Sequence, residues 1–224
     1  MANTVSRIIS DETLSCIIQI ESAGKPTAKA RTSSATGLGQ FIDATWMSVV
    51  SRHRPDLLKG RSKAQVLALR KDPVIAIEVL ARFTEDNARA LGSGYSNGDP
   101  YLAHFASVGT AKRLLNASRD APVSSIMSPA AIHANPGILK DKTAGQIRVW
   151  AERKMKAAQG KNWIAKLYRG ASVIPETRLN ETAAADPEVA PRTGKAEGVS
   201  NAFKVVLLIV VLTIVIAMAL LKIG

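Results

Sequence analysis

The sequence predicts a mainly α-helical globular domain that is followed by a flexible linker and a C-terminal transmembrane helix. Three observations support this prediction. Apolar side chains recur at the three- and four-residue spacing of helices through residues 1–171. No segment of that region shows the alternation of polar and apolar residues that a half-buried strand produces. Residues 205–221 form one uncharged apolar run near the end of the chain.

The first predicted helix covers residues 11–23, with Ser10 or Asp11 as its cap. Its apolar stripe, Leu14, Ile17 and Ile18, continues onto Glu21 at the i+7 position. A carboxyl on a core-facing stripe is poorly solvated, and desolvation raises its pKa. Glu21 is therefore predicted to stay protonated near neutral pH and to act as a general acid. A Glu at a helix end that reaches water or bonds loop amides is the alternative.

A loop of small residues follows this helix. Gly24 is expected to supply the left-handed C-terminal residue and Pro26 prevents the helix from continuing. Residues 33–40 then read SSATGLGQ, in which Gly37 and Gly39 allow backbone to approach a ligand closely. Gln40 offers a donor and an acceptor for a sugar amide or hydroxyl. An ordinary tight turn before a second helix is the alternative interpretation.

These motifs resemble the catalytic segment of soluble-lytic-transglycosylase-type enzymes, which are relatives of goose-type lysozyme. The segments that carry the resemblance are Glu21-Ser22, the run SSATGLGQF and the following Ala44-Thr45-Trp46. Residues 103–109, AHFASVG, stand where that family has an Ala-Tyr-Asn-Ala-Gly-x-Gly-like motif. Residues 135–138, NPGI, together with the helix after Thr143 resemble the end of the domain in some members of the family. The resemblance covers roughly residues 8–158. Two departures are Gly39, in place of the Met of a Gly-Leu-Met-Gln motif, and His104-Phe105, in place of Tyr-Asn.

The resemblance implies a lysozyme-like fold and a peptidoglycan lytic transglycosylase. Such an enzyme cleaves the β-1,4 bond between N-acetylmuramic acid and N-acetylglucosamine and forms a 1,6-anhydro-muramyl product. It implies Glu21 as the catalytic residue. The residues it implies for substrate binding are Ser22, Gly37, Leu38, Gln40, Tyr101 and His104.

Several alternatives stay open at this stage. Tyr101 and Phe105 stand four residues apart and are also typical of core aromatics. Asp43 is interpreted as a helix cap, but if it positions a water the enzyme would be a hydrolytic lysozyme. Glu78 is expected to be a solvated or structural acid rather than a second catalytic carboxylate.

The net charge of +12 belongs to the globular part of the chain. Residues 1–171 contain 25 Lys and Arg against 13 Asp and Glu, whereas residues 172–224 contain five of each. Such a surface favours polyanions, and peptidoglycan glycan strands are the expected partner. Aromatic residues are only 4% of the chain and no run of five basic residues occurs, so no specific nucleic-acid binding is predicted.

No cofactor and no metal are expected. His53, His104 and His133 are too scattered for a zinc site, and no phosphate-binding glycine loop is present. Cys16 is a single cysteine within an apolar helix, where burial is the ordinary reason for it.

Cap signals place the other helices. Ser62 is expected to cap a short helix that ends near Arg70, and Thr143 with Gln146 forms a capping-box pattern. Asp72-Pro73 starts a longer helix, interpreted as the buried central helix of the domain. On its water-facing side the sequence places Glu85, Asp86 and Arg89.

Beyond the domain of residues 1–171, composition changes twice. Residues 172–200 are rich in Ala, Pro, Glu, Thr and Gly and are predicted to be a linker. Residues 201–224 contain the apolar run Val205–Leu221 between Lys204 and Lys222, which is about 25 Å long as a helix and is predicted to enter a lipid bilayer. The N-terminal residues lack the apolar run of a secretory signal.

Together these features predict a membrane-anchored protein that acts in the bacterial envelope, in the periplasm. A phage particle protein that opens the wall during genome entry, or a host-membrane lysis protein, is the expected setting. Other virion or envelope-spanning proteins are then expected partners. Two other classes stay open: a non-catalytic glycan-binding component of a virion or secretion channel, and a basic membrane-tethered nucleic-acid binder.

Overall fold

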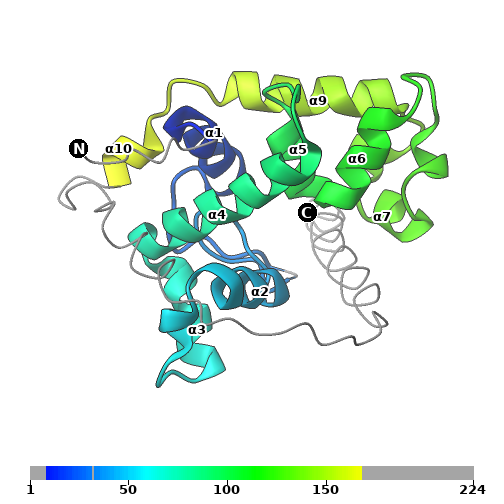
Figure 1. Cartoon of the computed structure of the whole chain (residues 1–224). Coiled ribbons are helices and arrows are strands. Elements are labelled where there is room, and N and C mark those ends of the chain that lie inside the picture. Colours follow the sequence, from blue (N-terminus) through cyan, green and yellow to red (C-terminus); the bar gives the residue numbers. More distant parts are fainter. Residues whose placement is uncertain (1–8, 32, 168–224) are drawn as a thin grey trace, which may run out of the picture.

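The computed structural model describes residues 9–31 and 33–167, which fold mainly as α-helices (Figure 1). The helices are α1 (Asp11–Ser22), α2 (Asp43–His53), α3 (Lys63–Ala68), α4 (Pro73–Leu91), α5 (Asp99–Ala106), α6 (Val108–Asn116), α7 (Pro129–Ala134), α8 (Pro136–Leu139), α9 (Ala144–Ala157) and α10 (Trp163–Leu167). Three short 3₁₀ segments are η1 (Pro55–Leu58), η2 (Leu69–Lys71) and η3 (Val123–Ser125). In these residues only isolated β-bridges occur, among them Lys29 with Thr36 and Thr36 with Phe41. The mainly α class is confirmed.

Helix α4 crosses the middle of the domain and contacts α1, α2, α5 and α6 (Figure 1). It begins where Asp72 Oδ1 accepts hydrogen bonds from the backbone N–H groups of Val74 and Ile75 at 2.9 and 3.0 Å. These bonds satisfy donors that have no partner inside the helix, and Pro73 has the φ angle that a first turn needs. The prediction of a central helix with this start is confirmed.

One expectation for α4 is wrong. Glu85 was expected to face water, but it is buried. Arg82 and Arg89 lie one turn away on either side and pair with its carboxylate at 3.5 and 3.7 Å. The two guanidinium groups give the buried carboxylate oppositely charged partners, so the chain can cover it.

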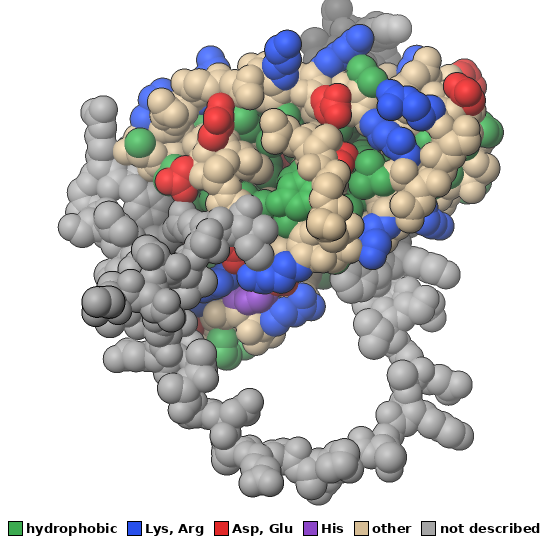
Figure 2. All heavy atoms as spheres, turned by 45° about the horizontal axis from the view of Figure 1, so that its top comes forward, with side chains coloured by type: hydrophobic (Ala, Val, Ile, Leu, Met, Phe, Trp, Pro, Cys, Tyr) green, Lys and Arg blue, Asp and Glu red, His purple; other side chains and the backbone are tan. Residues whose placement is uncertain are grey.

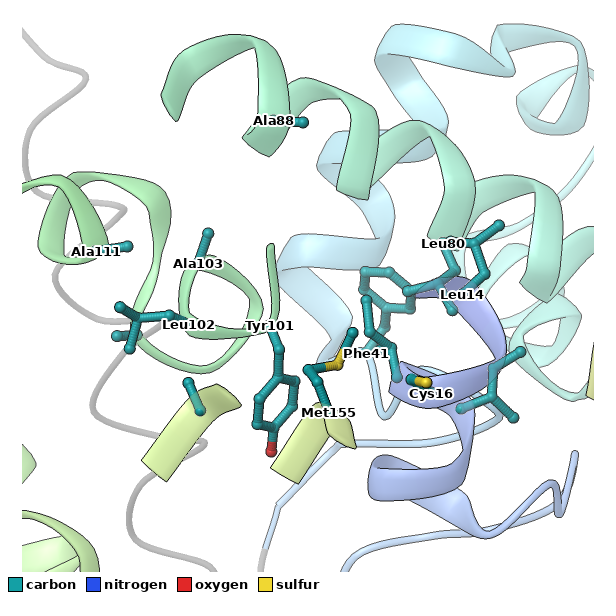
Figure 3. Packing of buried hydrophobic residues seen from close by; sticks show 14 of the residues in the cluster. Leu14, Cys16, Phe41, Leu80, Ala88, Tyr101, Leu102, Ala103, Ala111 and Met155 are labelled. Atoms are coloured by element: carbon teal, nitrogen blue, oxygen red, sulfur yellow. The ribbon is translucent and has the colours of Figure 1, made fainter. Parts of the chain in front are cut away.

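The core lies between α1, α2, α4, α5 and α9. Trp46 is fully buried and its indole N–H donates to the carbonyl of Val66 at 2.9 Å, which ties α2 to α3. Figure 3 shows side chains from α1, α5, α9 and the loop before α2 converging on one another, among them Leu14, Phe41, Tyr101 and Met155. Cys16 lies in this core as expected.

The end of α1 differs from the expectation in one detail. The left-handed C-terminal residue is Ala23, at φ 49°, and its N–H closes the last turn on the carbonyl of Gln19. Gly24 follows at φ 73°, and a Cβ there would stand 2.4 Å from the ring of Trp163. Glycine is required at this position for both reasons.

Helix α10 was not predicted and packs against α1. The indole N–H of Trp163 donates to Gln19 Oε1 at 2.9 Å, and the backbone N–H of Ile164 donates to Ser15 Oγ at 3.2 Å. The predicted linker and membrane span, residues 172–224, lie outside the described residues. Among the helices that are described, none is both long enough and apolar enough to cross a bilayer.

Candidate active site

Glu21 lies in the last turn of α1, where neighbouring side chains cover most of it. Only 21% of the side chain is exposed. Burial raises the pKa of this carboxyl from 4.5 to about 7. A hydrogen bond from Tyr101 and the positive charge of Lys154 oppose that rise but do not overcome it. The carboxyl is thus poorly hydrated, although the Glu21 side chain as a whole is not fully covered.

Tyr101, on α5, lies beside the Glu21 carboxyl. Its ring is buried, with 4% exposure, and its hydroxyl donates a hydrogen bond to the Glu21 carboxyl. Burial, together with the nearby Glu21 charge, raises the pKa of the Tyr101 hydroxyl well above its usual range. The hydroxyl therefore remains a hydrogen-bond donor. Tyr101 fixes the position of the acid, and its predicted contact with substrate stays a prediction.

His104 lies one turn after Tyr101 and also borders Glu21. Its Nε2 is 3.1 Å from the carbonyl oxygen of Gly39 and 3.9 Å from Glu21 Oε1. The side chain is 10% exposed, and burial lowers its pKa to about 4. His104 is therefore neutral at pH 7. Since the carbonyl requires a donor, the proton is on Nε2. A neutral imidazole leaves the Glu21 carboxylate without a cationic neighbour at this position, which is consistent with its high pKa.

The loop before α2 is held by its own hydrogen bonds. The N–H of Gly37 donates to the carbonyl of Ala28 at 2.8 Å. The side-chain amide of Gln40 donates to the carbonyls of Gly37 and Ala28 at 2.9 and 3.2 Å. Gln40 Oε1 has no hydrogen bond within residues 9–31 and 33–167, so the acceptor that the sequence assigned to a sugar is still available. The donor is already engaged.

Arg70 fastens this loop to η2, and sequence reasoning missed it. Its buried guanidinium donates to the carbonyls of Ser34 and Phe41 at 2.8 and 2.9 Å. The same group pairs with Asp43 Oδ1 at 2.8 Å. At Gly37, φ is 84° and a Cβ would meet the Arg70 carbonyl oxygen at 2.1 Å, so only glycine fits. No local signal distinguishes Arg70 in the sequence, because its partners are about 30 residues away.

Asp43 does not cap α2, which corrects the expectation. Ile42 is the residue at the cap position, and the backbone N–H of Asp43 donates to Ser34 Oγ at 3.1 Å. The Asp43 carboxylate is held by Arg70 instead. The other candidate acid, Glu78, pairs with Arg54, in agreement with its expected structural role.

Ser22 and Leu38 make internal contacts. The Ser22 hydroxyl is buried and donates to the carbonyl of Ile18 at 3.1 Å. Leu38 is fully buried in the core. Both side chains are engaged inside the domain. A direct contact with substrate stays a prediction for both.

The two departures from the family pattern touch each other, since His104 bonds the carbonyl of Gly39. A Cβ at Gly39 would lie 2.9 Å from the Phe41 ring and 3.2 Å from Leu80. A methionine side chain would therefore clash here with Phe41. Gly39 and His104 therefore form one local arrangement.

No protein-family model matches this chain. In the part of the chain that the structure describes, no group of three or more His, Cys, Asp or Glu side chains is placed to hold a metal ion. The interpretation of the site consequently rests on Glu21 and the groups around it.

Proposed function

We propose that this protein cleaves the β-1,4 bond between N-acetylmuramic acid and N-acetylglucosamine of peptidoglycan, with Glu21 as the only catalytic carboxyl. The observation that carries the proposal is the state of Glu21. A carboxyl with a pKa of about 7, on a side chain that is not fully covered, is protonated often enough to act as an acid at neutral pH. It is also ionised often enough to act afterwards as a base.

Both roles are used in a lytic transglycosylase reaction. Glu21 donates its proton to the bridging oxygen as the bond from that oxygen to C1 of the muramic sugar breaks. The acetamido group of the substrate stabilises the positive charge at C1. The C6 hydroxyl of the same sugar then attacks C1 and its proton returns to the Glu21 carboxylate, so no water is consumed and the product is the 1,6-anhydro sugar.

Two arrangements around Glu21 support a mechanism with one carboxyl. Asp43 and Glu78, the other acids considered from the sequence, are each paired with an arginine, which favours structural roles. Tyr101 orients the Glu21 carboxyl through its hydroxyl, so the proton is held in one place. A hydrolytic lysozyme would instead need a second group to activate water.

The test is mass analysis of the saccharides released from purified sacculi by the full-length chain. An anhydro product is lighter by one water than a reducing-end product, so its appearance supports the proposal, while reducing ends identify a hydrolase. Glu21→Gln keeps the size of the side chain and is expected to release no saccharide. If this variant digests sacculi as fast as the parent, the site has been assigned wrongly, and a non-catalytic glycan-binding role becomes the better account.

The setting is part of the proposal. A span at Val205–Leu221 would tether the enzyme to a membrane beside the wall that it opens, as expected for a phage entry or lysis protein. Recovery of the intact chain in the membrane fraction, and loss of that association when residues 201–224 are deleted, tests the tether.

A further inference from the structure

A hollow lies beside α9, between that helix, α8 and the segment that follows α6. Its volume is about 560 Å³. Among the residues that line it are Arg119, Lys142, Gln146, Trp150 and Arg153. In Figure 2 Lys and Arg side chains are spread over this face of the molecule, with exposed hydrophobic side chains between them.

The walls of this hollow are fixed by backbone hydrogen bonds. The N–H groups of Ala144 and Gly145, at the start of α9, donate to the carbonyls of Ala121 and Arg119 at 2.9 and 2.8 Å. The N–H of Val123 donates to the carbonyl of Lys142 at 2.8 Å. A Cβ at Gly145 would stand 2.9 Å from the Arg119 carbonyl oxygen, so this close approach depends on glycine. The segments that carry Arg119 and Lys142 are therefore held in place relative to Arg153 on α9.

The cations around the hollow are unpaired within the described residues. Arg119, Lys142 and Arg153 make no side-chain hydrogen bond or ion pair there, and only Asp120 contributes a negative charge to the lining. Other arginines of the domain do pair with acids. Five of them bind carboxylates, namely Arg52, Arg54, Arg70, Arg82 and Arg89. Cations gathered around a hollow without counter-charges raise its positive potential and attract an anion.

Trp150 connects this hollow to the candidate active site. Its ring is partly exposed and lies 4.9 Å from the ring of Phe105 and 5.7 Å from the ring of Tyr101, measured between centroids. Tyr101 in turn donates its hydroxyl to Glu21. Tyr101 and Trp150 therefore link the acid to the lining of the hollow.

We propose that this hollow binds a carboxylate carried by the glycan strand that Glu21 cleaves, with Arg119 and Arg153 as its main ligands. The inference rests on the proposed function. Each muramic sugar carries a lactyl ether that ends either in a free carboxylate or in a peptide with carboxylates of its own. A guanidinium group binds a carboxylate through two parallel hydrogen bonds, and Trp150 offers an apolar face to the adjoining sugar. The hollow would then select muramic strands over uncharged glycans.

Binding measurements in a Glu21→Gln background test this without cleavage. Three probes of equal sugar length separate the carboxylate sources: chitin oligosaccharides without carboxylate, peptide-free strands with the lactyl carboxylate, and strands with the peptide in place. The variant Arg119→Gln/Arg153→Gln is compared with the matched control Lys59→Gln/Lys63→Gln. The control removes two exposed charges near α3, at the other end of the domain (Figure 1).

The expected result is a loss of about tenfold in affinity for at least one carboxylate-bearing probe in the Arg119/Arg153 variant. Affinity for chitin oligosaccharides and the melting temperature should remain unchanged, because neither side chain makes an internal bond in the described part of the chain. The probe that loses affinity identifies the source of the carboxylate.

Three outcomes overturn the inference. The Arg119/Arg153 variant keeps its affinity for both carboxylate-bearing probes, the control variant loses as much affinity as the Arg119/Arg153 variant, or the parent binds chitin oligosaccharides as tightly as muramic strands. The proposed function is judged separately, from sacculus digestion. The Arg119→Gln/Arg153→Gln variant is also measured with Glu21 restored. If it digests sacculi with an unchanged KM, the hollow does not bind the carboxylate, while the assignment of the active site is unaffected.

Discussion

Replacing Glu21 by Gln should stabilise the folded protein above neutral pH and leave its stability nearly unchanged in acid. The carboxyl has a pKa of about 7 in the folded protein against 4.5 for an ordinary Glu. Between these values the folded state holds a proton that the unfolded state has lost, so the stability of the parent falls as the pH rises. The difference corresponds to about 3 kcal/mol once both states are ionised. Gln cannot ionise, so its variant avoids this loss.

Urea unfolding of parent and variant at intervals from pH 4 to pH 9 measures the effect. The free-energy difference should be constant below pH 4.5, rise in favour of the variant up to about pH 7 and then level off. Any cost of the amide itself is independent of pH, and Tyr101 can still donate to the amide oxygen. A difference that does not vary with pH, or one that grows towards acid, would refute the assignment of Glu21 as a desolvated carboxyl.

Three further predictions concern the surroundings of Glu21. Tyr101→Phe removes a hydrogen bond that lowers the pKa of Glu21. The alkaline limb of the pH profile of the cleavage rate should therefore move to higher pH by roughly one unit or less. A limb that stays at the same pH would contradict the contact between Tyr101 and Glu21. Arg70→Lys should lower the free energy of unfolding by about 2–4 kcal/mol, because a lysine cannot bond Ser34, Phe41 and Asp43 together. Asp43→Asn should lower the free energy of unfolding by less and should keep cleavage activity. A large loss of activity in Asp43→Asn would instead favour a hydrolytic mechanism. Gly37→Ala should destabilise the folded protein by about 1–3 kcal/mol, because Gly37 has a positive φ and the added Cβ would meet the Arg70 carbonyl. Gly60 also has a positive φ but has open space around it, so Gly60→Ala should cost less when both variants are melted under the same conditions.

Local signals in the sequence were sufficient to predict most helices. Ser10, Ser62, Asp72 and Thr143 are each followed by a helix whose first N–H groups they bind, as expected from their side chains. These signals work because a cap and the donors that it satisfies are at most three residues apart. Helix α10 was not predicted from such a local signal. Its described contacts are with α1 and α4, which are distant from it along the chain.

The state of the acid was predictable in part. The position of Glu21 on an apolar stripe predicts a poorly solvated carboxyl, and the raised pKa agrees with that prediction. The hydrogen bond from Tyr101, the neutral His104 and the anchoring of the loop by Arg70 were not predicted. Each depends on residues that are far apart along the chain.

The sequence by itself determined where the capped helices begin and which face of α1 Glu21 occupies, because both depend on neighbouring side chains. The tertiary structure decided which groups surround the carboxyl and which charges remain unpaired. Solvation and charge pairing depend on distances through space, and only the packing of α1, α5, α9 and the loop before α2 fixes those distances.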